Sequence, residues 1–194
     1  MKYLNRLFVL SIISATLSLS CNASDKMEDN AGLVNSLAKK LISSKVALDF
    51  SKKSEVLQGD FNGDGIDDIA AVFLPVSDIK GTDKLKVIKL WNYPGQVSSG
   101  KQHKSIVIFH GSKSGWLSDA TQGFVLLDTT AALETPSFKL LISRVSDKDY
   151  RNHASYLPVK LKSDLIIVPT EAGIDTYIYW DKGSYKLFEP DEIP

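Results

Sequence analysis

The residues best suited to chemistry in this sequence lie in a short acidic segment, residues 59–68, which reads GDFNGDGIDD. Oxygen ligands recur on alternate residues, with side chains at positions 1, 3, 5 and 9 and a main-chain carbonyl at position 7: Asp60, Asn62, Asp64, Asp68 and Ile66. Calcium takes about six to eight oxygen ligands, and alternate residues of a tight turn point their oxygens toward one centre. Gly65 at position 6 permits the sharp bend that such a turn needs. The spacing therefore predicts a loop that binds one calcium ion in a structural role.

The alternatives to this calcium loop make different demands on the sequence. A helix–loop–helix calcium-binding hand requires a bidentate Glu at position 12 and a following helix, but position 12 is Ala71 and residues 69–74 are typical of a strand. A set of Asx-turns would use the carboxylates to accept backbone N–H bonds without an ion. Three carboxylates on one turn repel one another unless a cation is present, so the sequence favours the ion. Magnesium is the weaker candidate, because it demands a stricter octahedron and keeps its waters.

Residues 59–72 resemble the FG-GAP or VCBS type of repeat, which occurs in integrin alpha-chain propellers and in many exported bacterial proteins. Residues 109–115 add to this likeness. The resemblance implies that the acidic loop joins two strands and binds calcium through the same five residues, while Asp67 stays outside the ligand set. It covers one clear unit, whereas the family usually forms tandem arrays.

The sequence around the loop has the pattern of a mainly β domain. Apolar residues recur at helical spacing over residues 33–42, with Asp29 or Asn30 as N-cap, which predicts an amphipathic helix that ends near Ser44 and covers a sheet. Farther along, β-branched and aromatic residues follow the period of strands. The predicted strands are residues 46–50, 69–74, 85–88, 106–109, 124–127, 138–145, 156–161, 165–168, 174–180 and 185–188. Turn sequences separate them at residues 80–83, 93–95, 111–115 and 181–184.

Two pairs of segments are similar to each other, which predicts two β units. Residues 68–72 resemble residues 164–168, and residues 106–111 resemble residues 177–183. The second unit lacks the acidic loop before its Asp164, so as a copy it has lost the ion. A seven-bladed propeller needs a longer chain. We therefore expect a small antiparallel β-sheet domain, either two propeller-blade-like units or a sandwich, with one N-terminal amphipathic helix.

The first residues have the pattern of an export signal. Lys2 and Arg6 precede an apolar run over residues 7–19, which is too short to span a membrane. Residues 17–21 resemble a bacterial lipobox, although Ser18 stands where that pattern prefers Leu. The only cysteine, Cys21, is thus either the lipidated N-terminus of an outer-membrane lipoprotein, which we favour, or lost by cleavage after Ala23. The sequence predicts a signal peptide over residues 1–20, a polar tether over 21–30 and one β-rich domain over 31–194, exported to the periplasm or anchored through the lipid.

Charge and motifs argue against several functions. Lys plus Arg and Asp plus Glu number 23 each, which gives no basis for binding nucleic acid, or a membrane other than through the lipid. Residues 95–101 approach a phosphate-binding loop, but Gln102 replaces the required Ser or Thr. Residues 111–115 carry Lys113 where a nucleophile elbow needs serine. The three histidines, His103, His110 and His153, lack zinc-site spacing. We therefore expect no enzyme.

These observations together predict a non-catalytic, exported calcium-binding β domain that acts as a protein-binding module in the bacterial envelope. One concrete form is an inhibitor or immunity protein whose partner is another envelope or secreted protein. The first alternative is a module that binds cell-wall or other glycan through exposed aromatic residues. If Ile178 and Trp180 point inward, Tyr177 and Tyr179 face solvent or a partner. The second alternative is a hydrolase with an unrecognised site.

Overall fold

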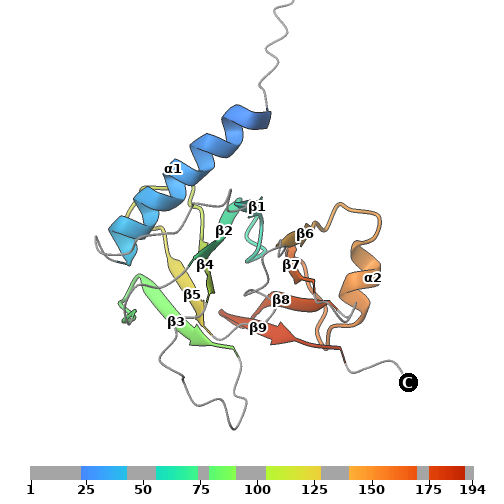
Figure 1. The fold of residues 1–194 in the computed structure, drawn as a ribbon. Helices are drawn as coiled ribbons and strands as arrows, with labels where there is room; N and C mark the ends of the chain where they lie inside the picture. The colour runs from blue at the N-terminus through green and yellow to red at the C-terminus, as the bar shows by residue number, and fades with distance from the viewer. Residues whose placement is uncertain are drawn as a thin grey trace, which may run out of the picture.

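The computed structural model describes residues 23–42, 56–73, 79–90, 104–127, 140–169 and 175–190. Within these ranges the chain forms nine strands and two helices (Figure 1). The expectation of a mainly β domain is therefore confirmed. The predicted signal segment with Cys21, the predicted strand at residues 46–50 and the turn at residues 93–95 lie outside the described residues.

The first sheet contains five strands in the order β1-β2-β4-β5-β3. Their bounds are β1 Leu57–Gly59, β2 Asp68–Phe73, β3 Leu85–Lys89, β4 Ser105–Phe109 and β5 Gly123–Leu127. The strands β1, β2, β4 and β5 pair antiparallel with their neighbours. β3 crosses to the far edge and pairs parallel with β5.

The second sheet contains four strands in sequence order, each antiparallel to the next. Their bounds are β6 Leu141–Ser143, β7 Leu165–Val168, β8 Thr176–Asp181 and β9 Ser184–Phe188. The predicted turn between β8 and β9 is present, and both of its central residues, Lys182 and Gly183, have positive φ, as the tightest β-hairpins require. The second sheet is therefore a four-stranded antiparallel meander, which is the strand arrangement of a propeller blade, whereas β3 interrupts the antiparallel strands of the first sheet in sequence.

Two helices and two sheets stack in four layers (Figure 1). Helix α1 (Ala23–Leu41) packs on the outer face of the first sheet, and the segment with α2 (Tyr150–Ser155) packs on the outer face of the second. Every residue of β4 is buried because both of its faces are covered: Val107 and Phe109 face α1, while Ile106 and Ile108 face the second sheet. The core between the sheets is apolar and aromatic, which favours their association.

Three sequence predictions about these elements are wrong. The helix begins at Ala23, so residues 23–30, expected to form a tether, are helical; this stretch lacks Gly and Pro, and its acidic residues suit the first turns of a helix. Residues 156–161 contain no strand: residues 156–159 form a turn and bends, and Pro158 cannot donate to a strand ladder. Within the described part of residues 138–145, the strand is only the three-residue β6. The helix α2 and the strand β1 are elements that sequence patterns did not predict.

Candidate metal centre

The acidic loop connects β1 to β2 at the side of the molecule where the first sheet meets β6 of the second. Phe61 anchors it, because this side chain is buried in the core between the sheets. Gly63 and Gly65 have φ angles of 79° and 81°, a region that glycine adopts without strain. Asn62, between Phe61 and Gly63, is half-buried, and Asp64, between the two glycines, is exposed. The loop therefore has a buried base and a polar rim that faces solvent.

Hydrogen bonds inside the loop fold it around its own carboxylates. The Asp60 carboxylate accepts bonds from the backbone N–H groups of Gly63, Asp64 and Gly65 at 2.8, 3.0 and 2.9 Å. Asn62 Oδ1 accepts from the Asp64 N–H at 2.9 Å, and Asp64 Oδ1 accepts from the Ile66 N–H at 2.8 Å. The Asn62 amide also donates to Asp64 Oδ2 at 3.2 Å. The Asx-turns of the alternative interpretation are thus present, and they set the curvature of the loop.

The carboxylate of Asp68 closes the loop from below and is fully buried, with 0% of the residue exposed. Its Oδ2 accepts bonds from the N–H groups of Phe61 and Asn62 at 2.9 and 3.1 Å, and its Oδ1 accepts one from Gly111 at 3.0 Å. Burial raises the pKa of Asp68 to about 7, and the nearby charge of Asp64 adds to this rise, while the N–H bond from Gly111 opposes it. This aspartate therefore joins the loop to the end of β4.

The donors left in the loop suit a hard cation. A carboxylate offers about four lone-pair sites, and Asp60 and Asp68 each use three on N–H groups, so about one remains on each. Asp64 uses two and keeps about two, and Asn62 Oδ1 keeps about one. With the Ile66 carbonyl and water, these oxygens could supply the ligand number of calcium. Within the described ranges, however, no group of three or more His, Cys, Asp or Glu side chains is arranged to hold a metal by itself, so calcium binding stays a prediction.

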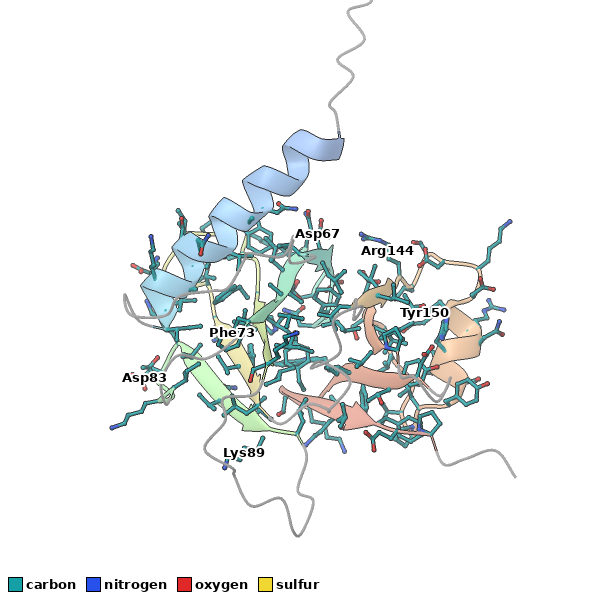
Figure 2. The ribbon with its side chains drawn as sticks, in the orientation of Figure 1. Asp67, Phe73, Asp83, Lys89, Arg144 and Tyr150 are labelled. Atoms are coloured by element: carbon teal, nitrogen blue, oxygen red, sulfur yellow. The ribbon has the colours of Figure 1, made fainter. Side chains whose placement is uncertain are left out.

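Polar contacts at this end of the molecule continue from the loop into the second sheet. The exposed Asp67 carboxylate accepts a bond from Gln58 Nε2 at 2.8 Å, and the Arg144 guanidinium donates to the Gln58 carbonyl at 2.8 Å. Figure 2 shows Asp67 and Arg144 at the same end of the molecule, near β1 and β6. The ion pairs found among the described residues, Lys40 and Lys84 with Asp119, lie away from the loop.

Two residues that contact the loop were not identified as site residues from the sequence. Gly111 donates its N–H to Asp68, and a Cβ at this position would collide with the Asp67 carbonyl oxygen and lie 2.9 Å from Ile66 Cγ2. Asp164 accepts a bond from the Asp60 N–H at 3.0 Å. Signals for both were present, since Gly111 lies in the segment that adds to the FG-GAP likeness and Asp164 begins the segment that echoes residues 68–72.

The two described histidines bond to tyrosines. His110 is buried, and its Nε2 lies 2.8 Å from the Tyr185 hydroxyl, with the rings of Phe124 and Trp180 packed around it. Burial lowers the pKa of His110 to about 4, an effect that the charge of Asp64 opposes and that of Lys86 reinforces. His153 Nδ1 lies 3.3 Å from the Tyr177 hydroxyl. His110 is therefore neutral at pH 7 and contributes to the core between the sheets.

No protein-family model, curated protein or solved structure matches this chain. The resemblance to FG-GAP or VCBS repeats thus depends on the residues of the loop alone and stays a prediction. Neither helix in the described part of the chain has the length and apolar character of a membrane span.

Proposed function

We propose that this protein is a non-catalytic, exported β domain that binds calcium at the acidic loop and uses the adjoining surface to bind another protein of the bacterial envelope. The observation that carries the proposal is the construction of the loop, in which solvent-facing oxygen donors stand on a buried base between two sheets. When bound, calcium would supply the positive charge that offsets repulsion among Asp60, Asp64 and Asp68. Calcium would then stiffen the end of the molecule where the sheets meet.

The surface beside the loop has the mixed character of a protein-binding site. Val145 is 49% exposed, and its N–H donates to the same Asp164 carboxylate that accepts a bond from the loop residue Asp60. Arg144 directly precedes Val145 and is exposed, and Gln58 links its guanidinium to the exposed Asp67 carboxylate. An apolar side chain with an arginine and a carboxylate at its rim is typical of interfaces. An inhibitor or immunity protein that blocks a secreted toxin is the concrete form that we propose, on the strength of the predicted export.

Affinity capture tests whether the protein binds a partner and whether that binding depends on calcium. The tagged full chain is incubated with the envelope fraction of the producing cells, in calcium and in chelator. We expect a partner that is retained in calcium and reduced in chelator, and that is lost with Val145→Asp. Leu117→Asp is the matched control. Leu117 is 55% exposed, but it lies outside the proposed binding surface, in the segment whose backbone Lys40 of α1 contacts. Capture that is insensitive to chelator and to Val145→Asp would contradict the proposal.

Binding to a glycan is the second candidate, but Tyr177 and Tyr179 do not supply an exposed aromatic surface for it. Ile178 and Trp180 do face the first sheet, which was the condition for outward-facing tyrosines, but Tyr177 and Tyr179 are buried beneath the segment with α2. The aromatic surface that favours a glycan is instead Tyr156, which is 48% exposed and stacked on Tyr177 with an interplanar angle of 20°. An exposed aromatic face can contact a sugar ring. Pull-down with peptidoglycan should then depend on Tyr156 and be unaffected by Val145→Asp.

Activity screening distinguishes the hydrolase alternative from binding of a protein and from binding of a glycan. If such a site exists and uses a described histidine, the variants His110→Ala and His153→Ala should lose the activity. His153 is the more informative of the two, because it is half-buried beside the exposed Tyr156, whereas His110 lies in the core between the sheets.

A further inference from the structure

Asp164, which directly precedes β7 of the second sheet, forms a reciprocal pair of hydrogen bonds with the first residue of the acidic loop. Its Oδ2 accepts a bond from the Asp60 N–H at 3.0 Å, and its own N–H donates to the Asp60 carbonyl at 2.8 Å. The main chain of Asp60 is thus held on both sides of its Cα by one residue of the other sheet. The Asp164 residue is buried, so water competes little for these bonds.

The neighbouring backbone has the close approach that this contact needs. Gly59 lies directly before Asp60, and a Cβ on it would lie 2.7 Å from Asp164 Oδ2 and 2.5 Å from Ile142 Cδ1. Both distances are shorter than real Cβ contacts, so a larger residue at position 59 would displace the Ile142 side chain and the Asp164 oxygen that bonds to Asp60. The contact is therefore built into the sequence of both sheets.

Asp60 is also the residue on which the curvature of the loop depends most. Its carboxylate accepts the N–H bonds of Gly63, Asp64 and Gly65. The two bonds from Asp164 restrain the main chain of Asp60 and so help to position the carboxylate that accepts these three bonds. The other carboxylate oxygen of Asp164 accepts the Val145 N–H at 2.9 Å, which ties the same contact to the segment after β6.

We propose that Asp164 is a positioning residue for the acidic loop: it holds Asp60 from the second sheet, so that the loop's affinity for a divalent cation depends on the packing of the two sheets. This inference rests on the calcium site of the proposed function, in which Asp164 is not a ligand. It also connects that site to Val145, so a protein bound there and calcium in the loop would act on the same contact. Outer-shell partners of this kind typically change metal affinity by about 10–100-fold when they are removed.

The test uses the full chain as wild type, Asp164→Ala and the control Asp149→Ala. Asp149 is an exposed aspartate just before α2 whose side chain forms no capping bond, so its removal deletes the same charge without the contact. Calcium affinity is measured by titration calorimetry. In chelator, amide exchange by NMR follows the Gly63, Asp64 and Gly65 N–H groups against those of β4. We expect Asp164→Ala to weaken calcium binding about tenfold or more and to speed exchange in the loop while β4 stays protected.

The outcomes separate the two proposals. Equal calcium affinity in Asp164→Ala and Asp149→Ala would overturn the positioning role and leave the calcium site standing. Failure of the wild type to bind calcium would overturn the proposed site, and the positioning role would then stand or fall on whether Asp164→Ala speeds exchange of the three loop amides. If Asp164→Ala does not fold, Asp164→Asn serves in its place, because it keeps the volume and one acceptor but cannot accept at both oxygens.

Discussion

Calcium should raise the melting temperature of this protein, and Asp64→Ala should abolish that rise. A ligand present at 100 times its dissociation constant stabilises the folded state by about 2.7 kcal/mol when it binds only that state. For a chain of this length, each 1 kcal/mol shifts the midpoint by about 2–4 °C. We therefore expect a rise of about 5–11 °C in saturating calcium.

Asp64 is the best position for this test because the structure makes it nearly dispensable without the ion. It is exposed, and its two bonds, with the Ile66 N–H and the Asn62 amide, involve groups near the loop surface where water can replace it. Its loss in chelator should therefore cost about 1 kcal/mol or less. The same carboxylate keeps about two lone pairs for a cation, so its removal should take away the response to calcium.

The measurement is differential scanning calorimetry in chelator, in calcium and in magnesium. Asp67→Ala is the matched control, since Asp67 is the adjacent acidic residue, bonds to Gln58 and lies outside the proposed ligand set. It should keep the calcium response. The reasoning is refuted if calcium leaves the wild-type midpoint unchanged, or if Asp64→Ala keeps the full rise.

Two further predictions concern residues behind the loop. Gly111→Ala should lower the free energy of unfolding by about 1–3 kcal/mol, because its Cβ would collide with the Asp67 carbonyl. Urea denaturation measures this change. The control Gly32→Ala should not lower the free energy of unfolding, because a Cβ at Gly32 would have no atom within 4 Å. The pKa of His110 is lowered from 6.5 to about 4 in the folded state, so the unfolded state takes up the proton first as the pH falls. In chelator, the contribution of His110 to stability should therefore fall by about 3 kcal/mol between pH 6.5 and pH 4. Denaturation across this range should show a shallower pH dependence for His110→Gln, and parallel curves would contradict the assignment.

Local patterns predicted most of the elements because they record which faces are buried. The apolar run at residues 106–109 predicts a strand, and the continuous burial of β4 between α1 and the second sheet explains why the run is apolar throughout. The alternation in β8 separates Ile178 and Trp180, which face the other sheet, from Tyr177 and Tyr179 on the opposite face. Alternation does not say what covers the opposite face, which is why Tyr177 and Tyr179 were expected to face solvent or a partner, although α2 and its flanking turns cover them.

Other features depend on pairings between distant segments, which a local pattern does not encode. β3 follows β2 in sequence but lies at the far edge of the sheet beside β5. Helix α2 has six residues, too few to show a helical period. The contact between Asp60 and Asp164 joins residues 104 positions apart. The sequence shows that the segment beginning at Asp164 is similar to the one beginning at Asp68, but it does not show that Asp164 bonds to Asp60.

The comparison of these two aspartates separates the roles of the predicted ligands. Asp68 is the first residue of β2 and Asp164 directly precedes β7. Each accepts the N–H of the residue two positions beyond the preceding strand, Phe61 for Asp68 and Val145 for Asp164. Asp164 does this without an acidic loop before it, so this role needs no ion, and the argument for calcium depends instead on Asp60, Asn62 and Asp64.

Asp68→Ala should therefore behave differently from Asp64→Ala. It would leave three N–H groups without their acceptor, two of them on the anchoring segment of Phe61 and Asn62, and should cost about 3 kcal/mol or more in chelator as well as in calcium. Relief of the buried charge offsets part of this cost, because burial raises the pKa of Asp68 to about 7. Chemical denaturation of both variants in chelator decides the matter. If Asp68→Ala is as stable as Asp64→Ala without calcium, the buried carboxylate is not what joins the loop to β4.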